Sequence, residues 1–275
     1  MAKQIQLIPK NIVFPVARIL DKEDRELYQE VERKTKEKFG NSQAYKTILN
    51  GIHTENVTGS QFFWNTNLNQ YLPKGQNVIS LEDMETINNQ DESFFKGFYT
   101  DTPEIILRTA TLSWENNKYI LKDLIKQINS ETNKGAKYEF SSENPLRISG
   151  LELIKDRNSR NKYGLLLKIG DNTKVTNDSR FAYSNHGKQI PFGEKTKTIY
   201  TKENDLSRVF LSRGDNLDSW GGDLAGSGDF GRVVVKDAEG VAPENLLNKL
   251  NDKYKSLRNE IEEKKKNLIS EIQKL

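Results

Sequence analysis

The spacing of apolar residues changes near Ser130, and this change constrains the fold more than any other feature of the chain. Before Ser130 apolar side chains recur at helical intervals, most regularly over 114–128, which predicts a helix there. After it, short apolar runs bounded by turn residues, as at 146–154 and 163–169, predict strands. Helices followed by strands indicate an α+β fold.

Local signals place several elements within this frame. Residues 21–39 read as a charged helix that Asp21 can cap and Gly40 can end. Ser80 with Asp83 resembles a capping box for a short helix. In the second half, the turn residues 170–172 predict a hairpin between strands at 163–169 and 173–176.

The polar segment 129–137 marks a domain boundary. We therefore expect a helix-rich α+β domain over residues 1–138. A β-rich domain, built as a small antiparallel sheet or barrel, is expected over residues 139–240. Residues 241–275 are expected to form a separate C-terminal helix.

That C-terminal helix is predicted from apolar residues at heptad spacing. The apolar positions are Leu247, Leu250, Tyr254, Leu257, Ile261 and Leu268. The repeat weakens toward its end, where Lys264 and Glu271 occupy core positions. A lone helix would not keep such a stripe in water, so we expect a coiled-coil partner. The partner is either the same helix in another copy or the helix over 21–39.

Composition excludes several classes of protein. Without cysteine there can be no disulfide, thiolate nucleophile or cysteine-based metal site. The 42 basic and 39 acidic residues give a net charge of +3, which is small for a dedicated nucleic-acid-binding chain. No apolar run approaches the ~20 residues that a membrane helix needs, and the first residues lack a secretory pattern. We expect a cytoplasmic protein with no membrane partner.

The segment GSGDFGRV at 226–233 matches the glycine-rich loop that covers ATP phosphates in protein kinases. A kinase needs a large catalytic lobe after this loop, and too little chain follows. A dinucleotide-binding loop must open a helix, whereas residues 233–235 read as a strand. We therefore expect a glycine-rich turn that leads into a buried strand.

Acidic residues are spaced among these glycines, at Asp215, Asp218, Asp223 and Asp229. They could hold a hard cation or build tight turns, and their spacing matches neither calcium repeat known from sequence patterns. His53 and His186 are far apart and show no metal-ligand spacing, and no nucleophile elbow is present. We expect no catalytic residue, no metal and no cofactor.

The best candidate for nucleic-acid contact is a basic loop in the second half. It contains Lys155, Arg157, Arg160 and Lys162. Nearby aromatic side chains that could stack on bases are Tyr163, Phe181 and Tyr183. Because Asp156, Asp171 and Asp178 interleave with the cations, a solvated face of mixed charge is the simpler alternative.

Three functional hypotheses follow. The first is a non-enzymatic binding or scaffold protein that oligomerises, or docks a partner helix, through residues 241–275. The second is a nucleic-acid-associated protein that binds through the basic loop at 155–162. The third is an enzyme of unrecognised type that uses the Gly/Asp-rich segment 214–231.

Overall fold

The structure is a computed structural model of the chain. It describes residues 17–91, 93–109, 115–133, 138–141, 144–178, 190–192, 197–201, 206–212, 217–219, 222–237, 255, 258–259 and 261–265. Ala17–Lys236 form one compact unit, and Met1–Val16 with Asp237–Leu275 form a second. The first of these units contains the helices and sheets described below.

Helices lie mainly in the first half of this unit. They are α1 (Arg25–Phe39), α2 (Gln43–Leu49), α3 (Phe62–Leu68), α4 (Leu81–Gln90) and α5 (Lys118–Asn133), with 3-10 turns η1 (Lys22–Asp24) and η2 (Glu115–Asn117). The strands are β1 (Ala17–Ile19), β2 (Gln76–Val78), β3 (Thr100–Leu107), β4 (Leu146–Ser149), β5 (Glu152–Lys155), β6 (Leu165–Lys168), β7 (Lys174–Asn177), β8 (Ile190–Phe192), β9 (Lys197–Thr201), β10 (Leu206–Leu211), β11 (Leu217–Ser219) and β12 (Val234–Asp237).

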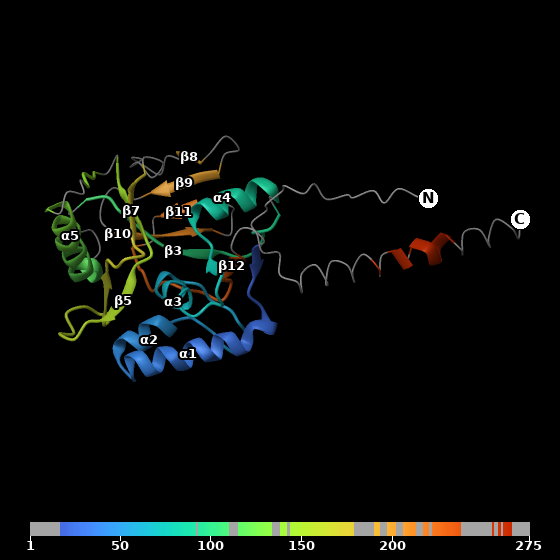
Figure 1. Cartoon of the computed structure of the whole chain (residues 1–275), viewed down its shortest axis with the longest axis horizontal. Coiled ribbons are helices and arrows are strands. Elements are labelled where there is room, and N and C mark those ends of the chain that lie inside the picture. Colours follow the sequence, from blue (N-terminus) through green and yellow to red (C-terminus); the bar gives the residue numbers. More distant parts are fainter. Residues whose placement is uncertain are drawn as a thin grey trace, which may run out of the picture. The chain divides into compact units, whose positions relative to one another are not determined.

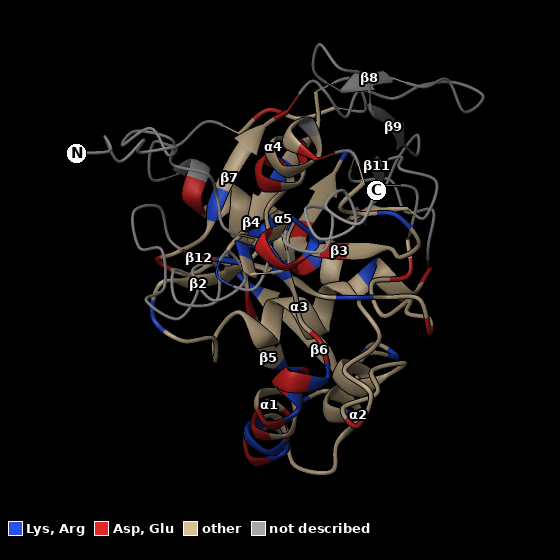
Figure 2. Cartoon of the chain, turned by 90° about the vertical axis from the view of Figure 1, so that its right-hand side faces the viewer, with Lys and Arg blue, Asp and Glu red and all other residues tan. Residues whose placement is uncertain are grey.

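The capping signals in the sequence are confirmed. Asp21 caps η1 through a reciprocal capping box, and α1 follows directly. Gly40 ends α1 with a φ of 63°, a left-handed conformation that a residue without a Cβ adopts at little cost. Ser80 and Asp83 form the predicted capping box of α4. Figure 2 shows acidic and basic residues alternating along α1, where Arg33 pairs with Glu30 and Glu37.

The main sheet has seven strands in the order β7-β4-β3-β10-β11-β9-β8. Its pairs are antiparallel except β11 with β9. Strand β3 is central and buried at every position, as its apolar run Ile105, Ile106 and Leu107 suggests. Strand β12 lies between β1 and β2 in a second sheet, and β5 pairs with β6 in a third.

Helices cover the sheets on several sides (Figure 1). All seven residues of α3 are buried, and this helix packs against β3. The ring centroids of Trp64 on α3 and Tyr28 on α1 are 5.1 Å apart, which joins these two helices in the core. Helix α5 packs on β6, so that one side of it faces away from the core.

The expected hairpin in the second half is wrong. Strands β6 and β7 do not form a hairpin, because β6 pairs with β5 whereas β7 pairs with β4. Gly150 (φ 68°) breaks the run 146–154 into β4 and β5, which then join different sheets. The described strands of the β-rich half lie in mainly antiparallel sheets, and the largest of these sheets also contains β3 from the first half.

The α+β class is confirmed as a mixture of helices and mainly antiparallel sheets. The boundary at residue 138 stays a prediction about independent folding, and the seven-stranded sheet crosses it. In the described part of the chain, no helix has both the length and the apolar character that a membrane crossing requires.

A long C-terminal helix over 241–275 is not seen. Most of that segment, including Leu247, Leu250, Tyr254, Leu257 and Leu268, lies outside the described residues. Within it, 261–265 are helical and fully on the surface, and Ile261 is 64% exposed. The heptad interpretation therefore stays a prediction.

Candidate functional site

The glycine-rich segment 226–233 packs closely against neighbouring backbone, whereas Asp229 and Phe230 within it are exposed. Gly231 pairs with Tyr99 in an isolated parallel bridge, and Arg232 N–H donates to the carbonyl of Tyr99 at 3.0 Å. A Cβ on Gly231 would stand 2.5 Å from the backbone nitrogen of Ser60. This glycine is therefore required by close backbone packing, and the expectation of a turn that leads into a buried strand is confirmed by Val233 and Val234.

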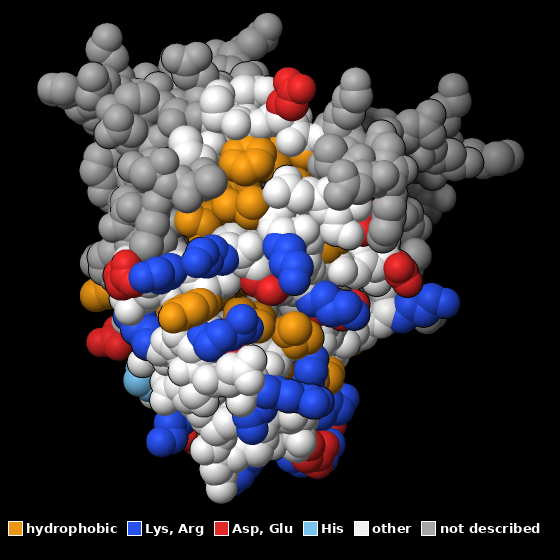
Figure 3. All heavy atoms as spheres, turned by 90° about the vertical axis from the view of Figure 1, so that its left-hand side faces the viewer, with side chains coloured by type: hydrophobic (Ala, Val, Ile, Leu, Met, Phe, Trp, Pro, Cys, Tyr) orange, Lys and Arg blue, Asp and Glu red, His pale blue; other side chains and the backbone are white. Residues whose placement is uncertain are grey.

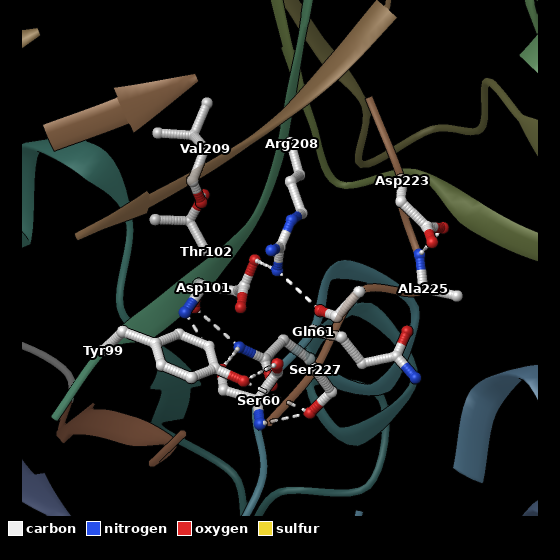
Figure 4. Close-up of polar contacts among 12 residues, drawn as sticks. Ser60, Gln61, Tyr99, Asp101, Thr102, Arg208, Val209, Asp223, Ala225 and Ser227 are labelled. Carbon is white, nitrogen blue, oxygen red and sulfur yellow. Dashed lines mark hydrogen bonds and ion pairs between the residues drawn. The ribbon is translucent and has the colours of Figure 1, made fainter. Parts of the chain in front are cut away.

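Polar atoms of this segment are used by neighbouring elements (Figure 4). The hydroxyl of Ser227 accepts from Ser60 N–H at 3.1 Å and donates to the carbonyl of Gly51 at 3.0 Å. Arg208 on β10 donates to the carbonyl of Gly226 at 2.7 Å and pairs with the buried carboxylate of Asp101 on β3 at 2.6 Å. These contacts hold the segment against β3, β10 and the loop that precedes α3.

The acidic residues of the segment 214–231 are dispersed. Asp223 accepts hydrogen bonds from the Tyr163 hydroxyl at 3.1 Å and from Ala225 N–H at 3.2 Å. Asp218 lies in β11, and Asp215 is outside the described residues. Within the described ranges, no three His, Asp or Glu side chains lie close enough together to share a metal ion.

His53 comes close to one of these acids, which the sequence did not suggest. Its Nε2 lies 3.5 Å from Oδ1 of Asp229, beside a surface cavity of about 870 Å³. Both side chains are largely exposed, Asp229 at 89%. A pair in open solvent is weakly held. His186 lies outside the described residues.

The predicted basic loop connects β5 and β6. Lys155, Arg157, Arg160 and Lys162 are all exposed. Asp156 organises the loop from inside, because its buried carboxylate accepts from the backbone N–H groups of Asn158, Arg160 and Asn161 at 3.2, 2.7 and 3.2 Å. In the sequence, Asp156 looked like an opposing surface charge. In the structure it is buried and fixes the conformation of the loop that carries the cations.

A row of lysines on α5 extends this basic loop. Lys118, Lys122 and Lys126 are four residues apart and so share one side of the helix. The guanidinium of Arg160 lies 5.9 Å from the ring centroid of Tyr119, which brings the loop and the helix together. We call the following set the basic face: Lys118, Lys122, Lys126, Lys155, Arg157, Arg160 and Lys162.

Figure 3 shows blue side chains gathered on the side of the molecule where α5 lies. Segments 115–126 and 155–162 together contain these seven basic residues and three acidic ones. Of the acids, Asp156 is buried and Glu115 pairs with Lys118 at 2.8 Å. The third, Asp123, is half-buried and accepts from Gln127 at 2.9 Å. The solvent-facing charge of this face is therefore mostly positive.

Of the predicted stacking residues, Tyr163 is not available to a base. It is 1% exposed, and its ring packs 5.2 Å from that of Phe63. Phe181 and Tyr183 lie outside the described residues. The exposed aromatic on the basic face is Tyr119, at 37%.

A second feature is a polar cleft of about 1090 Å³, bordered by α4, β4 and β5. Glu104 on β3 is 3% exposed there and accepts from Leu81 N–H at 3.1 Å, at the start of α4. Arg147 on β4 contacts Glu104 at 3.4 Å and also pairs with Glu82 and Asp178. Burial raises the pKa of Glu104 to about 7 in spite of Arg147, with Glu82 and Asp83 contributing in the same direction as burial.

Two parts of these sites were not predicted, although the sequence carries a signal for each of them. Lys118, Lys122 and Lys126 stand at helical spacing opposite the apolar side of the helix predicted over 114–128. Glu104 is an isolated acid directly before an apolar run, a place where burial is expected.

Comparisons with known proteins were made for the whole chain. No protein family, no curated protein and no solved structure matches it.

Proposed function

We propose that this protein binds nucleic acid through the basic face. The observation that carries the proposal is the contact of Arg160 with Tyr119, which joins the loop cations and the α5 lysines into one surface. Phosphate groups are contacted chiefly by lysine and arginine side chains, and such contacts supply most of the affinity of sequence-independent binding.

The geometry of the cations supports the proposal. Lys122, Lys126 and Arg157 are exposed, and no ion pair is found for them within the described ranges. When a cation without an acidic partner contacts a phosphate, the counterions held by the nucleic acid are released. This release is the source of sequence-independent affinity. The loop is also held in shape by Asp156, so that little ordering is needed on binding.

Replacing Lys122, Lys126 and Arg157 together by glutamine should weaken binding to a nucleic acid on the order of 10- to 100-fold near 0.1 M salt. The slope of log K against log salt should become less steep by up to about 2 to 3, because up to three phosphate contacts are lost. Fluorescence anisotropy over a range of salt concentrations measures both quantities.

The matched control replaces Lys22, Lys74 and Lys96 by glutamine. These lysines are exposed, lie on other elements and change the net charge by the same amount. Equal losses in the two variants would show an effect of net charge alone, and no binding of any nucleic acid at low salt would refute the proposal.

A second candidate function is pairing through the C-terminal helix. It is favoured by Ile261, an apolar residue that is 64% exposed in a helical stretch. We expect the full chain to show at least twice its 31.6 kDa mass in light scattering. Replacing Leu250 and Leu257 by aspartate should return it to the mass of one chain, because charged residues at core positions disrupt a coiled coil. Equal single-chain masses for both proteins would exclude self-association.

A further inference from the structure

Tyr119 lies on α5 among the lysines, and its side chain is exposed. Among the described residues, the large apolar or aromatic side chains that remain exposed are Tyr119, Phe230 and Ile261. The neighbours of Tyr119 toward solvent are Lys118, Lys122 and Arg160. A ring in this position presents a flat apolar surface beside positive charge.

The lysines around Tyr119 are arranged in a line along α5, which we call the lysine track. Lys118, Lys122 and Lys126 follow the helix axis at steps of about 6 Å, since each residue of an α-helix rises about 1.5 Å. Charges spaced in this way can follow one nucleic-acid backbone. Arg160 reaches the track from the β5–β6 loop and lies over the same ring.

Base stacking on aromatic side chains is a mark of proteins that bind single strands. In a duplex the base faces are covered by their neighbours, so a surface tyrosine gains little from them. In a single strand they are free to stack. Arg160 brings the β5–β6 loop next to α5. Helix α5 therefore does not project from the surface by itself, unlike a helix that enters the major groove of DNA.

We infer that the basic face binds single-stranded nucleic acid, with the backbone along Lys118, Lys122 and Lys126 and one base stacked on Tyr119. The inference rests on the proposed function and adds the kind of nucleic acid to it. Arg160 positions the ring and offers its own plane for stacking. The contact is independent of sequence, because every base has a face that can stack.

The test compares oligothymidine, oligouridine and a duplex of oligothymidine with oligoadenine, all of equal length, by fluorescence anisotropy of the full chain. The single strands should bind at least about tenfold more tightly than the duplex, and Tyr119→Leu should weaken their binding by about 5- to 100-fold. Duplex affinity should not change. The salt slope should also stay the same in Tyr119→Leu, because no phosphate contact is removed.

Two controls accompany this variant. Tyr119→Phe keeps the ring and should retain most of the single-strand affinity. Phe230→Leu removes another exposed aromatic, 53% exposed on a different part of the chain, and should have no effect. DNA and RNA single strands are separate arms of the test, and tighter binding of oligouridine would identify RNA as the ligand.

The results distinguish the inference from the proposed function. Duplex binding that equals or exceeds single-strand binding, with no effect of Tyr119→Leu, would overturn the inference and leave nucleic-acid binding in place. Absence of binding to all three probes at low salt would overturn both.

Discussion

Replacing Arg208 by methionine should lower the free energy of unfolding by about 3–5 kcal/mol, the range found when one partner of a buried ion pair is removed. The partner carboxylate, Asp101, has a side chain with 0% exposure and would stay buried in the core without this cation. The carbonyl of Gly226 would lose a donor at the same time. Urea or guanidinium denaturation measures the change.

The control is Arg33→Met on α1. Arg33 pairs with Glu30 and Glu37, but its side chain is 55% exposed, and exposed pairs contribute little to stability. Both variants remove one guanidinium and add the same side chain, so their difference reports the effect of burial. A loss below about 1 kcal/mol for Arg208→Met would contradict the role of this pair in holding the glycine segment.

Local features of this fold could be predicted, because their causes lie within a few residues. The capping box of Ser80 with Asp83 is one example, and the stop of α1 at Gly40 is another. Each depends on hydrogen bonds or backbone angles inside one turn.

Pairing between distant strands could not be predicted from the same signals. The turn residues 170–172 indicated a hairpin, but the kink at Gly150 sends β4 and β5 to different sheets. Strand β12 reaches its place between β1 and β2 from the far end of the described unit. A short apolar strand pairs with many partners about equally well, so the choice is made by the whole core.

The candidate site was predicted in part for a related reason. The four cations at 155–162 were found, because exposed positive side chains are visible in sequence. Charge counting treated Asp156 as an opposing surface charge, whereas it is buried and bonded to the loop backbone. Tyr163 and Tyr119 look alike in sequence, and only packing against Phe63 buries the first.

Glu104 should make the stability of this protein fall as the pH rises from about 5 to 8. Its pKa is about 7 in the folded state, above the ordinary value of 4.5, so the folded protein holds a proton that the unfolded chain releases. The stabilising effect of this proton is complete below the unfolded pKa and is lost as the pH passes through 7. The loss amounts to about 3 kcal/mol.

Substituting Glu104→Gln tests this dependence directly. Glutamine keeps the shape and can still accept from Leu81 N–H, but it has no proton to lose. The variant should match the natural protein near pH 5 and exceed its free energy of unfolding by up to about 3 kcal/mol at pH 8. Denaturation curves at several pH values measure the difference.

The matched control is Glu26→Gln, which changes an exposed carboxylate in the first turn of α1. An acid in the first turn favours the helix only weakly, so this substitution should leave the pH dependence of stability as it is in the natural protein. Arg147 acts against the rise in the pKa of Glu104, because it stabilises the ionised form of this carboxyl group. Glu82 and Asp178 pair with the same guanidinium, so Arg147 stabilises the ionised form of Glu104 less strongly. A difference between Glu104→Gln and the natural protein that stays constant from pH 5 to 8 would show that Arg147 outweighs burial.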